Sequence, residues 1–557
     1  MIKDKFINLN GRWLLNGKKI VIPFPPQSKL SEYNYDGEEE LVYETDFYIP
    51  DDYDRDRILL HFGAVDQITD VYVNDKFVGN HEGGYNPFYF DVTETVVKGN
   101  NHLTVKAVDR LDTDIPYGKQ CKKRGGMWYT PVSGIWQTVW LENVPDELVE
   151  DIIITPEIDS VTIELKGNVC GFKVQIYKEP VKEEFEKIYN GDLYESGENI
   201  VIDFEGRKGK VDFIREKINV VNWTPEEPYL YIMKIITETE TIKSYFALRR
   251  IEICDIKGVK RVCLNGSPIF LHGVLDQGYF RDGIYLPQNE MEYDRDVIRM
   301  KKLGFNMLRK HIKVEPERFY YACDRLGMLV MQDMVNNGEY SFVRDTALPT
   351  LGFKKKKDSY KKKRDLKKWD GQLKKFKEHT TETIKHLYNH PSIVAYTIFN
   401  EGWGQKESDD MYMYVRKLDD TRVIDSTSGW FAQSENDFDS RHIYFKEKKP
   451  TVKGKPLLVS ECGGYKMSVE GHLYSEKSYG YGKCESSEEL TGRIGKMYEQ
   501  MIIPGIEEGI CGCIYTQLSD VEDEINGLYT YDREVCKVQE EKMLNIRVEI
   551  DKIVEKI

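Results

Sequence analysis

The sequence lacks any long apolar segment. None of its hydrophobic runs approaches the roughly 20 residues that a membrane-spanning helix needs. The first residues, Met1 to Asn8, also lack the apolar stretch of a secretion signal. We therefore expect a protein with no membrane partner, and the missing export signal predicts a cytoplasmic location.

Cysteine is sparse and shows no organised spacing. The 10 cysteines are scattered over 557 residues, and no zinc-finger pattern connects them. Cys511 and Cys513 lie inside an apolar run, which predicts packing in a core. Without an export signal the thiols are expected to be reduced. No catalytic triad, phosphate-binding loop or Cys/His cluster appears either, so the sequence predicts no metal and no cofactor.

An excess of basic residues is missing as well. The 79 Lys and Arg are outnumbered by 94 Asp and Glu, which gives a formal net charge of -15. This balance argues against non-specific binding of nucleic acid. Aromatic residues make up 12% of the chain, with 36 Tyr and 8 Trp. Sugars bind to aromatic faces and polar edges, so this composition permits a carbohydrate site.

The length of the chain predicts about three domains, since it exceeds what one core can organise. Residues 1–144 show short alternating runs separated by turn residues, which predict a jelly roll or sandwich. Residues 145–255 form a second strand-rich block of the size of an immunoglobulin-like sandwich. The clearest predicted strands are Leu41 to Ile49, Arg57 to Phe62, Asp70 to Val73, His102 to Val108, Thr138 to Leu141, Val161 to Leu165 and Phe172 to Ile176.

From Val262 onward, strands alternate with helical segments. This order predicts a parallel sheet, and eight repeats within residues 256–557 predict a (β/α)8 TIM barrel. The predicted strands are Ile269 to Gly273, Phe305 to Leu308, Met328 to Gln332, Ser392 to Phe399, Arg422 to Ser426, Arg441 to Phe445, Pro456 to Ser460 and Ile510 to Thr516. The predicted helices are Glu290 to Lys302, Pro316 to Leu326, Leu373 to Tyr388, Asp409 to Leu418, Ser487 to Glu508 and Cys536 to Val554.

One insertion interrupts this pattern. Phe353 to Lys377 carries a dense cluster of lysines after the third predicted strand. The cluster is typical of a solvated helix face or a mobile loop. It would also suit a rim that attracts an acidic substrate, and the sequence leaves both interpretations open.

Glu401 and Glu461 carry the strongest chemical signal. Each ends a short apolar run, that of the fourth and the seventh predicted strand, and each is soon followed by glycine. The carboxyl ends of barrel strands meet at one reactive mouth. A pair of carboxylates there is what glycosidic bond cleavage needs, one as acid and one as nucleophile or base. The alternative for either residue is a helix cap or an ion pair.

Three further candidates lie at or just beyond the ends of the fourth, sixth and fifth predicted strands. Asn400, directly before Glu401, is expected to bond a sugar hydroxyl, although an amide there also suits a loop cap. The hydroxyl of Tyr444, in the sixth predicted strand, could orient Glu461, or its ring could belong to the core. Trp430 could stack on a sugar or pack in the core.

Four more candidates follow the first three barrel strands. His311 lies just beyond the second strand and is expected to contact substrate. Arg309 is expected to bond Glu461 and keep it ionised, unless it serves a plain buried ion pair. Asp276 and Asp333, after the first and third strands, are expected to bind sugar hydroxyls.

Four motifs resemble those of glycoside hydrolase family 2, the β-galactosidase and β-glucuronidase family. Gly126 to Gln137 resembles its sugar-binding-domain signature, and Leu264 to Gly273 resembles its entry to the barrel. Phe399 to Trp403 resembles its acid/base motif, and Ser460 to Gly463 its nucleophile motif. The motifs occur in the family order and span nearly the whole chain.

The resemblance implies a jelly-roll domain, an immunoglobulin-like domain and a catalytic barrel. It implies retaining exo-cleavage of terminal β-linked sugars, so the expected partner is a glycoside or oligosaccharide substrate. By motif, Glu401 becomes the acid/base, Glu461 the nucleophile, and Asn400 a neighbour of the sugar 2-hydroxyl. Enzymes of this family are often oligomeric, so the resemblance also suggests a homo-oligomer.

The chain departs from the family pattern in two places. Cys462 stands where an aromatic residue is usual, which predicts looser packing beside the nucleophile. Ile525 to Tyr529 lacks the lysine of the Asn-x-Lys pair with which glucuronidases grip the sugar carboxylate. The sequence therefore favours a β-galactosidase-like enzyme. The alternatives are a β-glucuronidase or β-galacturonidase, an inactive carbohydrate-binding protein, and a transglycosylase that uses the same glutamates.

Overall fold

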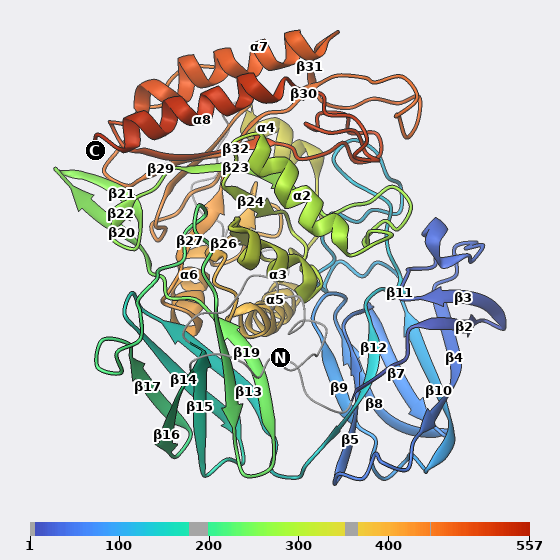
Figure 1. Cartoon of the computed structure of the whole chain (residues 1–557). Coiled ribbons are helices and arrows are strands. Elements are labelled where there is room, and N and C mark those ends of the chain that lie inside the picture. Colours follow the sequence, from blue (N-terminus) through green and yellow to red (C-terminus); the bar gives the residue numbers. More distant parts are fainter. Residues whose placement is uncertain (1–5, 178–198, 351–365, 446) are drawn as a thin grey trace.

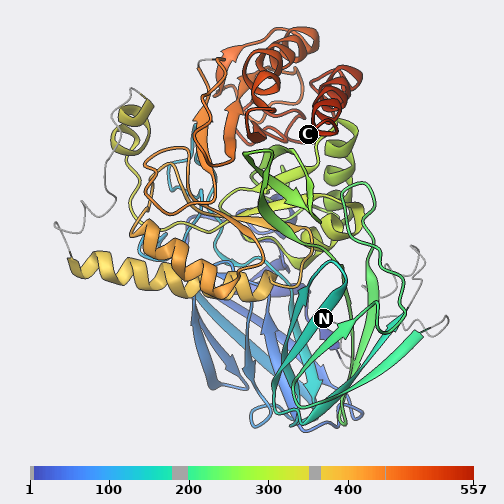
Figure 2. The same cartoon turned by 90° about the vertical axis from the view of Figure 1, so that its left-hand side faces the viewer.

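The computed structural model describes residues 6–177, 199–350, 366–445 and 447–557. Two strand-rich units lie side by side below a larger α and β part, which the C-terminal helices α7 and α8 cover from above (Figure 1). The view turned by 90° shows the same division (Figure 2).

The first unit consists of two larger antiparallel sheets. One has the order β1-β12-β5-β9 and the other the order β3-β2-β4-β10-β7-β8, while β6 and β11 pair separately. Leu103, Val105 and Ala107 of β10 are buried because alternate strand residues face the core. The strands are β1 (Phe6–Asn8), β2 (Gly11–Leu15), β3 (Lys18–Ile22), β4 (Glu40–Ile49), β5 (Arg57–Phe62), β6 (Val65–Asp66), β7 (Ile68–Val73), β8 (Lys76–Glu82), β9 (Phe88–Asp91), β10 (Gly99–Val108), β11 (Gly134–Ile135) and β12 (Val139–Val144), with the short helix η1 (Lys29–Ser31).

The second unit is a smaller pair of antiparallel sheets, β13-β14-β17 and β16-β15-β18-β19. Val161, Ile163 and Leu165 of β14 are buried in the core that these strands share. The strands are β13 (Val149–Pro156), β14 (Ser160–Gly167), β15 (Gly171–Tyr177), β16 (Asn199–Glu205), β17 (Lys208–Asp212), β18 (Tyr231–Ile236) and β19 (Thr241–Phe246).

A small sheet then leads into the barrel. It contains β20 (Ile251–Ile256), β21 (Val259–Leu264) and β22 (Ser267–Pro268). The boundary predicted between residues 255 and 256 falls inside β20, so a division before Ile251 would keep this sheet whole.

The catalytic part predicted from the sequence is a nearly closed, parallel barrel of eight strands. The sheet order is β27-β26-β25-β24-β23-β32-β29-β28, so the two end strands β27 and β28 are also consecutive in the chain. All eight predicted strands are confirmed, with shifts of a few residues at their ends. They are β23 (Leu271–Asp276), β24 (Met307–Lys310), β25 (Leu329–Asp333), β26 (Ile393–Asn400), β27 (Val423–Ser428), β28 (Asp439–Ile443), β29 (Leu457–Gly463) and β32 (Ile510–Thr516).

Helices cover the barrel largely where the sequence predicts them. One difference is that the helix predicted from Ser487 to Glu508 stays α-helical only to Met497 and then continues in π and 3-10 turns. Pro504 contributes to this change because it has no backbone N–H to donate. The remaining elements are α2 (Met291–Lys302), α3 (Glu317–Leu326), η2 (Phe342–Ala347), α4 (Leu348–Thr350), α5 (Leu366–Leu387), α6 (Ser408–Leu418), β30 (Tyr465–Lys466), β31 (Tyr481–Lys483), α7 (Ser487–Met497), η4 (Tyr498–Ile502), η5 (Ile503–Gly505) and α8 (Glu540–Val554).

Part of the lysine-rich insertion belongs to α5, which lies between the barrel and the first unit (Figure 2). Residues 353–365 of the insertion lie outside the described residues. In the described part, Lys375 Nζ lies 2.8 Å from a carboxylate oxygen of Glu82 in β8, and Lys368 Nζ lies 3.0 Å from one of Glu339. In this part of the insertion, Lys368 and Lys375 thus form ion pairs from the helix α5.

Two further expectations from the sequence concern membrane helices and cysteines. Within the described residues, no helix has both the length and the apolar character needed to cross a membrane. All ten cysteines are free, and Cys511 and Cys513 are buried in β32, as the apolar run predicts.

Candidate active site

Glu401 directly follows β26, at the carboxyl end of the barrel. Its backbone is left-handed, with φ of 54°, and its N–H donates to the carbonyl oxygen of Ser428 at 3.1 Å. Gly402 continues the turn with φ of 72°, and a Cβ there would lie 2.1 Å from the ring of Phe431. Only glycine fits this position, so the sharp turn after the strand fixes where Glu401 points.

Glu461 belongs to β29 on the other side of the mouth. The strand ends at Gly463, which has φ of 78° and where a Cβ would lie 2.3 Å from the ring of Tyr515. The two glutamates therefore have the same local arrangement. In both, a buried strand ends at or near the carboxylate, and a glycine then turns the chain away from the barrel mouth.

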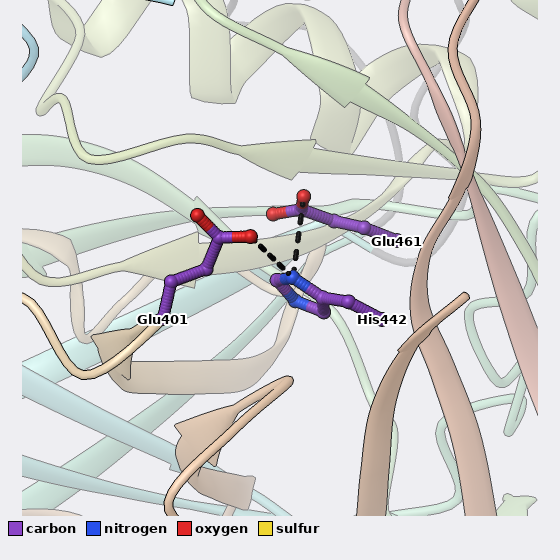
Figure 3. A group of neighbouring side chains, drawn as sticks. All are labelled: Glu401, His442 and Glu461. Carbon is purple, nitrogen blue, oxygen red and sulfur yellow. Dashed lines mark hydrogen bonds and ion pairs between the residues drawn. The ribbon is translucent and has the colours of Figure 1, made fainter. Parts of the chain in front are cut away.

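The barrel brings these two side chains together. One carboxylate oxygen of Glu401, one of Glu461 and a ring nitrogen of His442 all lie within 4.8 Å of one another. Figure 3 shows the imidazole of His442 beside both carboxylates, with one ring nitrogen joined to each by a dashed line. Its Nδ1 lies 2.9 Å from Oε1 of Glu401 and 3.4 Å from Oε2 of Glu461.

Glu461 is surrounded by groups that favour its charged form. Arg309 Nη1 donates to its Oε1 at 3.2 Å, and the hydroxyl of Tyr444 donates to its Oε2. Burial acts to raise the pKa of Glu461, but its neighbours His442, Arg309, His311 and Tyr444 act the other way and lower that pKa below its usual value. The predicted contact between Arg309 and Glu461 is thus present, and Tyr444 lies where it can orient the carboxylate.

Arg309 also connects the site to the strands behind it. Its Nη2 donates to Oδ1 of Asn400 at 2.9 Å, which directs the NH2 group of that amide away from the arginine. Both oxygens of Asp333 accept from the guanidinium at 3.0 Å, and one of them lies 2.7 Å from Nδ1 of His311. Asp333 is 1% exposed, so in this arrangement it holds Arg309 and His311 in place and is closed off from a sugar.

Asp276 is tied into another cluster. Its Oδ2 accepts from Lys310 Nζ at 2.6 Å and its Oδ1 from the backbone N–H of Gly278 at 2.9 Å. Lys310 also lies 2.9 Å from a carboxylate oxygen of Glu315. Because neighbouring strand residues face opposite sides, Arg309 points to the two glutamates while Lys310 points away. Both oxygens of Asp276 are engaged there, which gives the predicted sugar contact no support.

Trp430 is partly exposed and lies beside the site. Its ring is tilted against that of His442, with centroids 5.8 Å apart. It therefore borders the histidine that contacts both glutamates, a position that suits the wall of a sugar pocket.

Sequence reasoning missed His442, the residue at the centre of the site. The signal was available, since His442 and Tyr444 are two residues apart in the sixth predicted strand, a spacing that puts both side chains on the same side. Once Tyr444 is placed beside Glu461, the same alternation places His442 beside it.

A second missed group comes from loops. Glu524 is buried, and its carboxylate accepts from the hydroxyl of Tyr129 and from the amide of Asn526 at 2.9 Å. Lys119, from the first unit, is 8% exposed and lies 5.6 Å from the ring centroid of Trp128. Burial raises the pKa of Glu524, while Tyr129 and the charge of Lys119 act against it. No local pattern marks these loop residues in the sequence.

The donor set of Glu401, His442 and Glu461 is chemically able to attract a cation. However, both oxygens of Glu461 already accept hydrogen bonds from Arg309 and Tyr444. Hydrogen bonds and ion pairs therefore account for the arrangement of these three side chains.

Cys462 is fully buried beside Glu461, and its Sγ lies 3.2 Å from that of Cys513 on the adjacent strand β32. The two small thiols contact each other here, and the looser packing expected at this position stays a prediction.

A TIM barrel with two close carboxylates at its mouth is typical of glycoside hydrolases. Two family models match the chain: "Glycosyl hydrolases family 2, sugar binding domain" over residues 22–145 and "Glycosyl hydrolases family 2, TIM barrel domain" over residues 254–454. Together they span more than half of the sequence. The chain belongs to glycoside hydrolase family 2.

Relatives agree with this assignment. A β-galactosidase of Thermoanaerobacter pseudethanolicus is 27% identical over 484 residues, which cover 82% of this chain and 58% of that protein. The chain spans only about half the length of the curated relatives it matches. Among solved structures, a β-glucuronidase of Ruminococcus gnavus has a TM-score of 0.75 at 17% identity, covering 99% of both chains. A β-galacturonidase of Eisenbergiella tayi has a TM-score of 0.68 at 18% identity, covering 98% of this chain and 97% of that one. These two structures share the fold.

Proposed function

We propose that this protein is a retaining exo-β-glycosidase that removes terminal β-linked sugars by double displacement. The observation that carries the proposal is the approach of the two carboxylates to within 4.8 Å at the barrel mouth. Retaining glycosidases place these groups about 5–5.5 Å apart, whereas inverting enzymes need about 6.5–9.5 Å to admit a water molecule.

In the first step, ionised Glu461 attacks the anomeric carbon. A bond forms between a Glu461 oxygen and that carbon while the bond to the leaving oxygen breaks. Protonated Glu401 supplies the proton that the leaving oxygen needs. Arg309 and Tyr444 support this division of roles, because both donate to Glu461 and stabilise its charge before the attack.

In the second step, water takes the place of the leaving group. Glu401, now ionised, accepts a proton from the water while the water oxygen bonds to the anomeric carbon. The ester to Glu461 breaks, and the sugar leaves with its original β configuration. The amide NH2 of Asn400 is directed away from Arg309 and is available for a sugar hydroxyl, as the family motif implies.

Loops from the first unit favour cleavage at a chain end. Tyr129 bonds Glu524 and the N–H of Thr130 lies 3.1 Å from Glu522, so the first unit closes one side of the barrel mouth. A mouth closed on one side suits a single terminal sugar better than the middle of a long chain.

The test is a panel of nitrophenyl β-glycosides that includes galactose, glucose, arabinofuranose, glucuronate and galacturonate. We expect release of nitrophenol from at least one member, and proton NMR should show the β anomer of the sugar as the first product. The α anomer as first product would contradict the retaining mechanism. Binding without release across the panel would favour an inactive carbohydrate-binding protein, and transfer to an added acceptor sugar in place of hydrolysis would favour a transglycosylase.

For the sugar, we favour a neutral β-galactoside for two reasons. Asn526 has no lysine two residues later, so the pair with which glucuronidases grip a sugar carboxylate is missing. In addition, a relative that is 27% identical is a β-galactosidase. One observation favours an acidic sugar as the second candidate. Lys119 is 8% exposed, its ammonium lies 5.6 Å from the ring centroid of Trp128, and it forms no hydrogen bond or ion pair with another described residue. Its charge acts on both His311 and Glu524, and Glu524 is in turn affected by the charge of Glu461.

Lys119→Met separates the two candidates. If Lys119 binds a sugar carboxylate, this change should lower kcat/KM for the uronide about 100-fold or more and leave galactoside turnover nearly unchanged. Lys122→Met is the matched control, because Lys122 lies on the same loop, is exposed and pairs with Glu39. Equal losses on both sugars would exclude a carboxylate-binding role.

A further inference from the structure

His442 contacts both glutamates through one ring nitrogen. It is carried by β28, and its side chain is completely buried although its backbone is partly exposed. Nδ1 faces Glu401 at 2.9 Å and Glu461 at 3.4 Å, as Figure 3 shows, and Nε2 lies 3.0 Å from Oγ of Ser428. Each ring nitrogen therefore faces a specific polar partner.

The local packing holds the ring in this position. A Cβ at Gly429 would lie 2.5 Å from the imidazole, so the chain after β27 passes directly against it. Trp430 borders the ring on the same segment, with centroids 5.8 Å apart. The imidazole has little freedom to leave the two carboxylates.

A hydrogen atom must lie in the contact between Nδ1 of His442 and Oε1 of Glu401. An unprotonated nitrogen and a carboxylate oxygen at 2.9 Å would repel each other, so the Nδ1···Oε1 contact contains a hydrogen, carried by either atom. Oε2 of Glu461 already accepts from Tyr444, and its Oε1 accepts from Arg309. The shorter distance and the free acceptor both assign this hydrogen to the pair formed by His442 and Glu401.

Ser428 completes the arrangement. If its Oγ accepts from Nε2–H, the ring carries a hydrogen on Nε2 in every state, and Nδ1 is left to exchange a proton with Glu401. The pair then has two forms with the same number of protons. In one, Glu401 is a carboxylic acid and His442 is neutral; in the other, Glu401 is a carboxylate and His442 is a cation.

We propose that His442 is a positioning residue that shares the catalytic proton with Glu401, an inference that rests on the proposed glycosidase function. In the first step the proton leaves the pair for the departing oxygen while Glu461 bonds to the anomeric carbon. In the second step the pair regains a proton from water as the water oxygen bonds to that carbon and the ester breaks. The pair begins and ends each cycle with one shared proton.

The charges around the ring define the pH dependence. The titratable groups that face His442 are Glu401, Glu461 and Tyr444, whose ring centroid lies 6.4 Å from that of the imidazole. Asp425 is affected by the charge of His442, and Arg309 is the cation that bonds Glu461. Two basic sites that share one proton hold it to higher pH than one of them alone. Removing the imidazole should therefore move the alkaline limb of kcat/KM to lower pH.

His442→Asn is the informative variant, because its amide takes the place of Nδ1 without accepting a proton. We expect the alkaline limb to move down by about one pH unit. The loss should be large for substrates with poor leaving groups and small for dinitrophenyl glycosides, which depart without a proton. His472→Asn is the matched control, since His472 forms a similar pair with Asp532 at 2.9 Å away from the two glutamates and should leave the profile unchanged.

A uniform loss of activity at every pH and for every leaving group would overturn the proposal and reduce His442 to a packing residue. A second measurement does not depend on turnover. In protein labelled with 15N-histidine, which contains ten histidines, the Nδ1 signal of His442 should titrate together with Glu401 and lose that dependence in Glu401→Gln. An Nδ1 signal indifferent to Glu401→Gln would overturn the shared proton, whereas a lack of activity on every glycoside alongside a normal titration would count against only the proposed function.

Discussion

Glu401 and Glu461 are the same residue type at the ends of two strands of one barrel, yet their surroundings differ. Glu461 accepts from Arg309 and Tyr444, and its side chain is 6% exposed. Glu401 has a 13% exposed side chain and faces a histidine from a left-handed turn. The partners of Glu461 stabilise a fixed charge, while the partner of Glu401 can exchange a proton. Under the proposed mechanism, this difference in environment makes one side chain the nucleophile and the other the acid.

The largest expected effect comes from removing Glu461, the glutamate whose surroundings stabilise its charge. Glu461→Ala removes the group that forms the covalent bond, so kcat should fall about 10⁴–10⁶-fold on every glycoside. The measurement is steady-state release of nitrophenol, with circular dichroism as a check that the variant folds. Residual activity within tenfold of the parent would contradict the nucleophile assignment.

Glu401→Ala should separate the two roles. With a poor leaving group the loss of the acid should cost about 10²–10⁴-fold in rate, whereas an activated dinitrophenyl glycoside should still form the ester quickly. Added azide should then restore turnover and yield a β-glycosyl azide, because it attacks without needing a base. If azide restored Glu461→Ala as well as Glu401→Ala, and both gave an azide of the same anomeric configuration, the two glutamates could not have the different roles proposed here.

Arg309→Met weakens the charge support of Glu461. The arginine lowers the pKa of this carboxyl, so its removal should raise that pKa. The nucleophile must be ionised, and therefore the acid limb of kcat/KM should move to higher pH, with a loss of about 10²–10³-fold at the optimum. Arg416→Met, which breaks the ion pair between Arg416 on α6 and Asp437, is the control and should leave the acid limb in place.

Asp276→Asn should have the smallest effect on chemistry. Lys310 is 1% exposed and loses one of its two anionic partners, so we expect a destabilisation of about 3 kcal/mol with nearly unchanged KM. Thermal unfolding followed beside steady-state kinetics gives both quantities. A large rise in KM at unchanged stability would restore the sugar contact that the sequence predicts for Asp276.

The sequence predicts the barrel well, because the strands are short apolar runs with clear periods and Glu401 and Glu461 end two of them. It predicts the partners of those glutamates less well. The sequence analysis does not identify His442, because a single histidine forms no recognisable pattern. Only its spacing of two residues from Tyr444 indicates that it lies at the site. The sequence analysis does not identify Lys119 and Glu524 either, because they lie in loops far apart in the chain. Only the packing of the first unit against the barrel brings them together.

Asp276 and Asp333 show the opposite failure. Both end barrel strands, so their positions predict a role at the mouth. The structure ties Asp276 to Lys310 and Asp333 to Arg309 and His311. A position at a strand end fixes the neighbourhood of a side chain, but the partner that it finds there depends on residues from other strands.

The account rests on Glu461 becoming bonded to the sugar while Glu401 does not. After the panel identifies the sugar, the matching 2-deoxy-2-fluoro glycoside with a dinitrophenyl leaving group should trap the intermediate, because the fluorine slows its hydrolysis. Mass spectrometry of the digested protein should find one added sugar on the peptide that contains Glu461, and none in Glu461→Ala. A sugar attached to Glu401 or to another residue, or rapid turnover of ordinary substrate by a single displacement that leaves no trapped peptide, would contradict the account.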